Sequence, residues 1–430
     1  MLRHPSVHRQ TESDGMHSDD ILLLGIGIQP PWQLVDQHLD TSTQPHELHL
    51  EVAGERGARY PCPTCGTPCP AHDFQQKRWR HLNFFQHHCY ITASVPRVKC
   101  PEHGVHRVEV PWARKGSAFT LLFEQAALAL VREMPVLAAA RFMDITDTRL
   151  WRIVKHYVKQ AITQFDLSTV RGIGLDETAS KRGHNYVTIF IDMDRRQEPV
   201  LFVTPGRGKE TLQQFAAFLA SHGGDPQQVL EVVCDMSPAF ISGVNEHLPN
   251  AAITVDWFHI VQVFTRSVDT VRKLEGKEKP LPTHLRWAVL KRGQVGHLTD
   301  NQLLALAEII EQGLDTATAW RIKEKLAWVR RARTQRAARW RITHYLNWAR
   351  HLVGETPALE PVRKALATLS THIDRVVQRW TSTYTNARLE GFNGLFQAAR
   401  ARARGYRNTE TFMTMIYLIG SPAGSILKSI

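Results

Sequence analysis

The chain has 430 residues, more than one ordinary hydrophobic core accommodates, so two to four domains are expected. Its 43% hydrophobic and 22% charged residues exclude a disordered or membrane-embedded chain. Lys and Arg total 53 against 41 Asp and Glu, and the net charge of +12 favours a polyanionic partner such as nucleic acid, although a solvated basic surface gives the same balance.

The N-terminal residues 1–18 are polar and poor in aliphatic side chains, which predicts a disordered tail. The apolar run Ile21–Ile28 follows acidic residues and is too short to cross a bilayer, so neither a signal peptide nor a membrane span is expected. Six cysteines are too few for a disulfide scaffold in a chain of this length. These features predict a cytoplasmic protein.

Residues 19–110 are predicted to form two strands, Trp32–Leu39 and Glu47–Val52, followed by a zinc module. A CxxC pair and a CxxH pair offer four ligands for a tetrahedral Zn²⁺ at Cys62, Cys65, Cys100 and His103. Cys69 and Cys89 compete with them, so the fourth ligand stays open. Four protein ligands leave no open position, so the zinc is expected to be structural.

A basic aromatic segment, Lys77–His81, lies between the two cysteine pairs. Its Arg78 and Arg80 are candidates for contact with DNA phosphates. A solvated loop is the alternative interpretation.

Residues 111–166 have helix-turn-helix proportions, with helices predicted at Pro135–Met143 and Asp147–Gln160. Leu150, Val154 and Tyr157 share one face of the second helix, which suits packing. The other faces carry candidate DNA contacts, Arg149, Arg152 and Lys155. Any basic amphipathic helical hairpin has the same pattern, so this prediction depends on its neighbours along the chain.

Residues 167–264 alternate strand and helix signals, which predicts a mixed α/β sheet. The expected strands are Gly172–Glu177, Asn185–Met193, Val200–Thr204, Val229–Cys234 and Ala251–Val255, with a helix at Glu210–Ser221. From Trp257 to Trp380 the chain is helical, basic and rich in tryptophan. A last helix is predicted to begin near Asn386.

Acidic residues at the ends of these elements form the candidate catalytic site. Asp176 and Asp235 end two apolar strands, and Glu390 lies on the late helix. Three carboxylates that converge at a sheet edge can bind two Mg²⁺ or Mn²⁺ ions for phosphoryl transfer. Ordinary strand-end acids that cap helices or pair with Arg are the alternative. Glu177 is expected on the opposite face of its strand, and Asp256 and His259 are candidate supporting residues.

Taken together, these motifs resemble the transposases of the insertion-sequence ISL3 family over essentially the whole chain. The resemblance rests on the two cysteine/histidine pairs, the helix-turn-helix and five further blocks: Gly174–Glu177, Cys234–Ser237, Asp256-xx-His259, Thr385–Asn393 and Ala403–Asn408. It implies a multidomain α/β protein with an RNase H-like catalytic core and an Asp-Asp-Glu triad at Asp176, Asp235 and Glu390. Asn386 and Arg388, in the block around Glu390, are carried over as supporting residues.

The resemblance also accounts for the distance between Asp235 and Glu390, because an insertion interrupts the core in a number of such transposases. Here it would be all-helical, over 265–378, between core parts at 167–264 and 379–430. Residues Arg321–Arg350 include ten Lys or Arg and a single acid, Glu324. Backbone contact with DNA is predicted for Arg330, Arg331, Arg333 and, beyond the insertion, Arg404. A solvated helix is the alternative.

The predicted function is cleavage and strand transfer at the terminal inverted repeats of an insertion sequence, with target DNA as the second substrate. A homodimer is expected because two transposon ends must be brought together, and the nucleoid is the expected place of action. Two other functions remain open: a non-catalytic zinc and helix-turn-helix regulator, and an RNase H-type nuclease.

Overall fold

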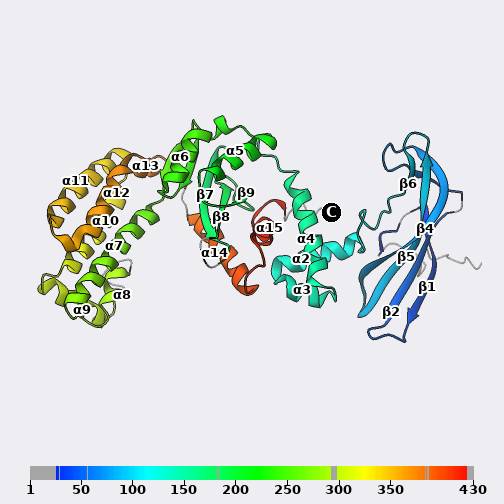
Figure 1. Ribbon diagram of the computed structural model, residues 1–430, viewed down its shortest axis with the longest axis horizontal. Coiled ribbons are helices and arrows are strands. Elements are labelled where there is room, and N and C mark those ends of the chain that lie inside the picture. The colour runs from blue at the N-terminus through cyan, green and yellow to red at the C-terminus, as the bar shows by residue number, and fades with distance from the viewer. Residues whose placement is uncertain are drawn as a thin grey trace, which may run out of the picture. The chain divides into compact units, whose positions relative to one another are not determined.

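The computed structural model describes residues 26–28, 30–55, 57–181, 183, 185–291, 298–382, 384 and 387–423 (Figure 1). They form two compact units, divided between Val154 and Lys155 within one helix. The predicted tail 1–18 and most of Ile21–Ile28 lie outside the described residues.

The first unit contains a six-stranded sheet with the order β1-β2-β5-β4-β3, in which β6 pairs with β5. Only β2 and β5 pair in parallel; the other neighbours are antiparallel. Buried Trp79 and Trp112 pack edge to face, with ring centroids 5.7 Å apart. The strands are β1 (Trp32–Asp40), β2 (Glu47–Gly54), β3 (Arg59–Pro61), β4 (Pro68–Phe84), β5 (His87–Cys100) and β6 (Gly104–Arg107).

The basic aromatic segment Lys77–His81 lies inside β4 and is not a loop. Alternation along the strand turns Trp79 and His81 into the unit, where both side chains are buried. Burial lowers the pKa of His81 to about 4, and its Nδ1 lies 2.9 Å from the Thr120 hydroxyl. The neutral imidazole therefore serves the packing of β4.

Three helices follow the sheet: α2 (Leu121–Glu133), α3 (Val136–Phe142) and α4 (Asp147–Ile162). Thr146 precedes α4 and accepts a hydrogen bond from the Arg149 N–H at 3.4 Å, as expected of an N-cap. The predicted packing face of α4 is confirmed, since Leu150, Val154 and Tyr157 are at most 3% exposed.

The second unit contains a five-stranded mixed sheet with the order β11-β10-β7-β8-β9. The first three strands in sequence are antiparallel neighbours, and the last two run parallel to β7. Its elements are β7 (Gly172–Ala179), β8 (Tyr186–Asp192), β9 (Val200–Pro205), α5 (Glu210–Ser221), β10 (Glu231–Cys234), α6 (Pro238–His247) and β11 (Ala252–Val255). All five predicted strands are confirmed.

Two C-terminal helices, α14 (Ala387–Arg402) and α15 (Thr409–Gly420), pack on this sheet (Figure 1). Gly174 lies at the approach of α14 to β7, where an added Cβ would lie 2.7 Å from Leu389 Cδ1 and would displace that side chain. The Val203 N–H donates to the Tyr417 hydroxyl of α15 at 2.8 Å, which ties α15 to β9.

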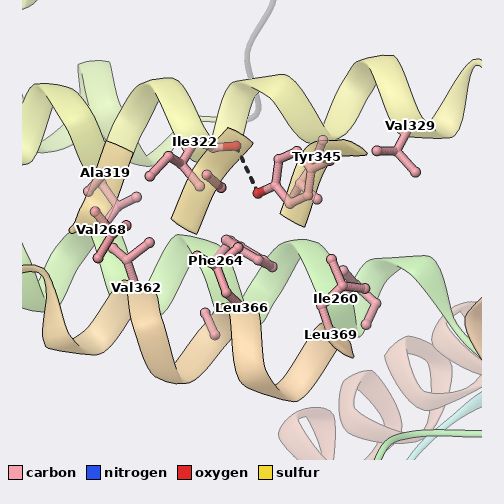
Figure 2. Close-up of a cluster of buried hydrophobic side chains, with 14 of the residues drawn as sticks. Ile260, Phe264, Val268, Ala319, Ile322, Val329, Tyr345, Val362, Leu366 and Leu369 are labelled. Atoms are coloured by element: carbon pink, nitrogen blue, oxygen red, sulfur yellow. Dashed lines mark hydrogen bonds between the residues drawn. The ribbon is translucent and has the colours of Figure 1, made fainter. Parts of the chain in front are cut away.

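Between β11 and α14 the described residues are helical, and they share one hydrophobic core (Figure 2). Phe264 of α7, Ile322 of α10 and Leu366 of α12 point into this core, and Tyr345 of α11 donates to the Ile322 carbonyl at 3.0 Å. The helices are α7 (Trp257–Glu278), α8 (Leu285–Leu290), α9 (Asp300–Glu311), α10 (Asp315–Arg330), α11 (Gln335–Val353), α12 (Glu360–Thr371) and α13 (Ile373–Val377).

Two buried charges close helix ends inside this helical segment. The Glu275 carboxylate accepts the backbone N–H groups of Asp315 and Thr316 at 2.9 and 3.0 Å, where the first turn of α10 lacks partners. The Lys323 ammonium donates to the carbonyls of Val289 and Lys291 at the end of α8. Lys323, one of the ten basic residues counted in the sequence, is thus used inside the fold. None of the described helices is both long and apolar enough to cross a membrane.

Candidate functional site

The four predicted zinc ligands converge in the first unit. The ligand atoms of Cys62, Cys65, Cys100 and His103 all lie within 4.8 Å of one another. The Sγ atoms of Cys65 and Cys100 are 3.7 Å apart. Two sulfurs at about 2.3 Å from one tetrahedral ion are separated by about 3.8 Å, so the donor set fits Zn²⁺.

Both pairs of ligands lie in the same kind of backbone turn. Gly66 and Gly104 follow the two pairs with positive φ angles of 73° and 78°, a conformation that glycine adopts without strain. The Cys65 N–H donates to the Cys62 sulfur, and this bond contributes most to lowering the Cys62 pKa to about 7, which favours the thiolate that a metal binds.

Position distinguishes the candidates for the fourth ligand. Cys69 and Cys89 are buried outside the cluster, and burial raises the pKa of Cys89 to about 11. His103 completes the set of four.

In the second unit, one candidate acid, Asp176, lies within β7, and two others, Asp235 and Asp256, directly follow the parallel strands β10 and β11. Val233 of β10 pairs with Gly174 of β7, and Cys234 pairs with Val255 of β11. Continuing this register places Asp235 beside Asp176 and Asp256 beside Asp235, at about 4.8 Å for each step between strands. The sheet thus gathers acids that lie far apart in the sequence.

Burial raises the pKa of Asp176 to about 6, and the negative charge of Asp235 adds to the shift. His259, in the first turn of α7, and the N–H of Glu177 act in the opposite direction. Asp235 is held by the Ser237 N–H, which donates to its Oδ1 at 2.9 Å. Hydrogen bonds therefore hold both carboxylates in place. The favourable contacts of Asp176 offset only part of the cost of burying its charge.

Helix α14 runs along β7 and contacts alternate residues of the strand. Asn393 Nδ2 donates to Asp176 Oδ2 at 2.8 Å, and Gln397 Nε2 donates to Thr178 Oγ1 at 2.5 Å. Four helical residues advance about 6 Å and two strand residues about 6.6 Å, so the two elements stay in step. Glu390 is exposed and lies one turn before Asn393, on the adjoining part of the same helix face.

Asn393 is the functional candidate that the sequence reasoning passed over, although it stands within the block around Glu390. Its Oδ1 is buried and has no hydrogen-bond partner among the residues that the structure describes. The spacing of three residues from Glu390, one helical turn, was the available signal. Asn386 and the side chain of Arg388, the predicted supporting residues on this segment, lie outside the described residues.

Comparisons with known proteins agree with this organisation. A family profile described as transposase matches residues 173–416, more than half of the chain. The chain belongs to this transposase family. Profiles for the helix-turn-helix domain of transposase family ISL3 and for the zinc finger of the IS204/IS1001/IS1096/IS1165 transposases match residues 108–158 and 59–103. The zinc module, the helix-turn-helix and the multidomain α/β organisation expected from the sequence are confirmed.

Two relatives show how far the similarity extends. The transposase of insertion sequence element IS1001 from Bordetella parapertussis is 25% identical over 377 residues, which cover 83% of the chain and 87% of the relative. The transposase of element IS1557 from Mycobacterium tuberculosis is 29% identical over 215 residues, about half of each protein. The transposase family indicates activity on DNA.

The basic residues predicted to contact DNA lie in different surroundings in this transposase. Arg149 and Arg152 of α4 are exposed, whereas Lys155 pairs with Glu410 at 2.9 Å. Arg330, Arg331, Arg333 and Arg404 are exposed.

On β4, Arg78 pairs with Glu47 at 3.0 Å, and its guanidinium lies 3.8 Å from the centre of the Tyr90 ring. The prediction for Arg80 is wrong: the side chain is buried, and its guanidinium donates to the carbonyl of Cys89 and to Asn83 Oδ1. Because the guanidinium of Arg80 is buried and hydrogen-bonded within the protein, it is not available to a DNA phosphate.

Glu177, set aside in the sequence analysis, lies 3.9 Å from the guanidinium of Arg207. Burial raises its pKa, and Arg207 opposes the shift. Asp256 is 8% exposed at the start of α7.

Proposed function

We propose that this transposase binds the terminal inverted repeats of an insertion sequence and catalyses metal-dependent cleavage and strand transfer on DNA. Asp176, Asp235 and Glu390 are the proposed metal ligands. The observation that carries the proposal is the alignment of Asp235 beside Asp176, with the pKa of Asp176 raised to about 6. Carboxylates crowded in this way favour a bound cation.

The donor set suits Mg²⁺ or Mn²⁺, which bind carboxylates and retain several waters. The buried, unpartnered Oδ1 of Asn393 supports the same interpretation, because a buried polar atom without a partner is costly in a finished site. Two such ions would activate a water or a 3′-hydroxyl and stabilise the leaving oxygen.

Neighbouring residues orient the carboxylates proposed as metal ligands. The Ser237 N–H orients Asp235, and the Asn393 amide orients Asp176 while holding α14 against β7. Glu390, one turn earlier on α14, is the third ligand in this proposal. His259 acts at the same sheet edge, where its charge opposes the rise of the Asp176 pKa.

The mixed sheet and α14 are proposed to be an RNase H-like core, and helices α7–α13 its helical insertion. Three antiparallel strands continued by two strands parallel to β7 support the first statement. The shared core of these helices, separate from the sheet in sequence, supports the second. In this proposal α4 and the zinc module recognise the DNA ends, and two copies of the chain pair them at the bacterial nucleoid.

The test is cleavage of end-labelled DNA that carries one terminal inverted repeat and its flank. We expect cuts at the repeat boundary with Mg²⁺ or Mn²⁺, and none without added divalent ions or on a scrambled repeat. Asp235→Asn is expected to bind the repeat and fail to cut it. Equal cutting by the wild type and Asp235→Asn contradicts the enzyme proposal, and specific binding without any cutting supports a regulator instead.

A further inference from the structure

We propose that an aromatic surface on α10 and α11 binds the unpaired bases of a DNA strand, an inference that rests on the proposed function for its DNA partner. The aromatic surface consists of Lys325, Trp328, Trp340, Arg341, His344 and Trp348.

The rings of this surface form a connected series. Trp340 and His344, one helical turn apart, have centroids 4.0 Å apart, and Trp340 meets Trp328 edge to face at 5.9 Å. Trp328 and Trp348 are half-buried and pack against the core of the helical segment, so these two rings are held in place. Trp340, by contrast, is 55% exposed. A large apolar ring is therefore held in place and left open to solvent.

Cations lie against the same rings. The Arg341 guanidinium is 5.2 Å from the Trp328 ring and donates to the Trp328 carbonyl at 2.8 Å. The Lys325 ammonium lies 5.6 Å from the Trp328 ring and 5.7 Å from the Trp348 ring. Exposed Arg336 and Arg339 flank Trp340 on α11, and Arg339 pairs with Asp374 at 2.5 Å. The surface thus offers positive charge beside ring faces.

This combination fits unpaired DNA better than duplex DNA. Cations alone serve the phosphates of either form, but an aromatic face stacks only on a base whose own face is free. Bases inside a duplex are already stacked on their neighbours. Cleavage at a transposon end releases strand ends whose bases can leave the stack, so this surface would hold a strand end during the reaction.

The experiment compares three forms of the inverted-repeat DNA by fluorescence anisotropy at one salt concentration. One is blunt, one has a thymine overhang of about six nucleotides, and one has an abasic overhang of the same length. The two overhangs carry the same phosphates, so only base stacking distinguishes them. We expect the wild type to bind the thymine overhang about tenfold more tightly than the abasic one.

Trp340→Ala is expected to abolish this preference and leave the affinity for the blunt duplex unchanged, while Trp340→Phe retains most of it. Trp287, on α8, is also 55% exposed, so Trp287→Ala is the matched control and is expected to keep the preference. Thermal unfolding of each variant checks the fold.

Absence of a preference in the wild type overturns the inference, as does an equal loss on all three DNAs in Trp340→Ala. Failure of the wild type to bind the inverted repeat contradicts the proposed function instead. The same overhangs, used as single strands, then still test the stacking surface.

Discussion

The residues of the zinc cluster come from two short turns, while the three acids proposed as metal ligands come from a strand, the end of another strand and a helix far apart in the sequence. The zinc ligands number four and close the coordination sphere, with sulfur atoms already at the separation that one ion requires. The acids lie beside one another with the pKa of Asp176 raised, and an orphaned amide oxygen lies next to them. The four ligands of the zinc cluster suit a structural ion, whereas the uncompensated acids suit the catalytic ions proposed above.

The largest effect is expected from the zinc site, because structural zinc contributes on the order of 10 kcal/mol in small modules. Cys100→Ser should lose zinc and unfold the sheet of the first unit, measured by metal analysis and circular dichroism. Cys89→Ser is the control, since Cys89 lies buried outside the cluster and should retain one zinc per chain. Full zinc content in Cys100→Ser would contradict the assignment of the four ligands.

Next in size is Glu390→Gln, which is expected to lower the cleavage rate at least about 10³-fold, or about 4 kcal/mol, because a metal ligand stabilises charge in the transition state. Binding of the inverted repeat should not change, since Glu390 is one exposed side chain on α14. Glu410→Gln, on the next helix, is the matched control. Comparable cleavage by Glu390→Gln and the wild type would remove Glu390 from the acidic cluster.

The raised pKa of Asp176 predicts how stability depends on pH without added magnesium. The folded state holds the Asp176 proton up to about pH 6 and the unfolded state only to about pH 4, so the contribution of Asp176 to stability should fall as the pH rises through this window. Asp176→Asn should abolish this dependence and gain up to about 3 kcal/mol at pH 7. Urea unfolding measures both, and added Mg²⁺ should stabilise the wild type alone. A stability difference between Asp176→Asn and the wild type that does not grow between pH 4 and 6 would contradict the burial of this charge.

The smallest effect is expected from Asn393→Ala, which removes a hydrogen bond to a charged group worth about 1.5–3 kcal/mol. We expect about a tenfold lower cleavage rate and a higher Mg²⁺ concentration for half-maximal activity, because Asp176 is no longer oriented. Gln397→Ala lies on the same helix face but contacts Thr178, so its Mg²⁺ requirement should stay at the wild-type value. Parallel behaviour of the two variants would reduce Asn393 to a packing role.

The cysteine and histidine pairs were easier to predict from the sequence than the acidic residues. The pairs Cys62/Cys65 and Cys100/His103 carry their geometry in local spacing, because each pair fits within one turn. The strands of the mixed sheet were predictable because they are short apolar runs, and the structure buries β7 and β8 along most of their length. Asp176 and Asp235 could be named from their position at strand ends, and the family resemblance supplied Glu390.

The sequence did not predict which individual side chains are buried or what they bind. Arg80 and Lys323 appear in basic stretches, yet both are buried and bonded to backbone carbonyls. Charge content says nothing about which side of a strand or helix meets the interior. The role of Asn393 depends on the register between α14 and β7, which no local pattern encodes.

Helix α7 connects the mixed sheet of the second unit with its helical segment. Its first turn carries His259, whose charge lowers the pKa of Asp176, and its last turns carry Glu275, which caps α10. An unbroken helix of 22 residues is about 33 Å long. Glu275 and His259 are 16 residues apart, or about 24 Å along the helix, so a tilt of about 5° around Glu275 would displace His259 by about 2 Å. A movement of α10 that shifts Glu275 would therefore also move an imidazole whose charge acts on Asp176.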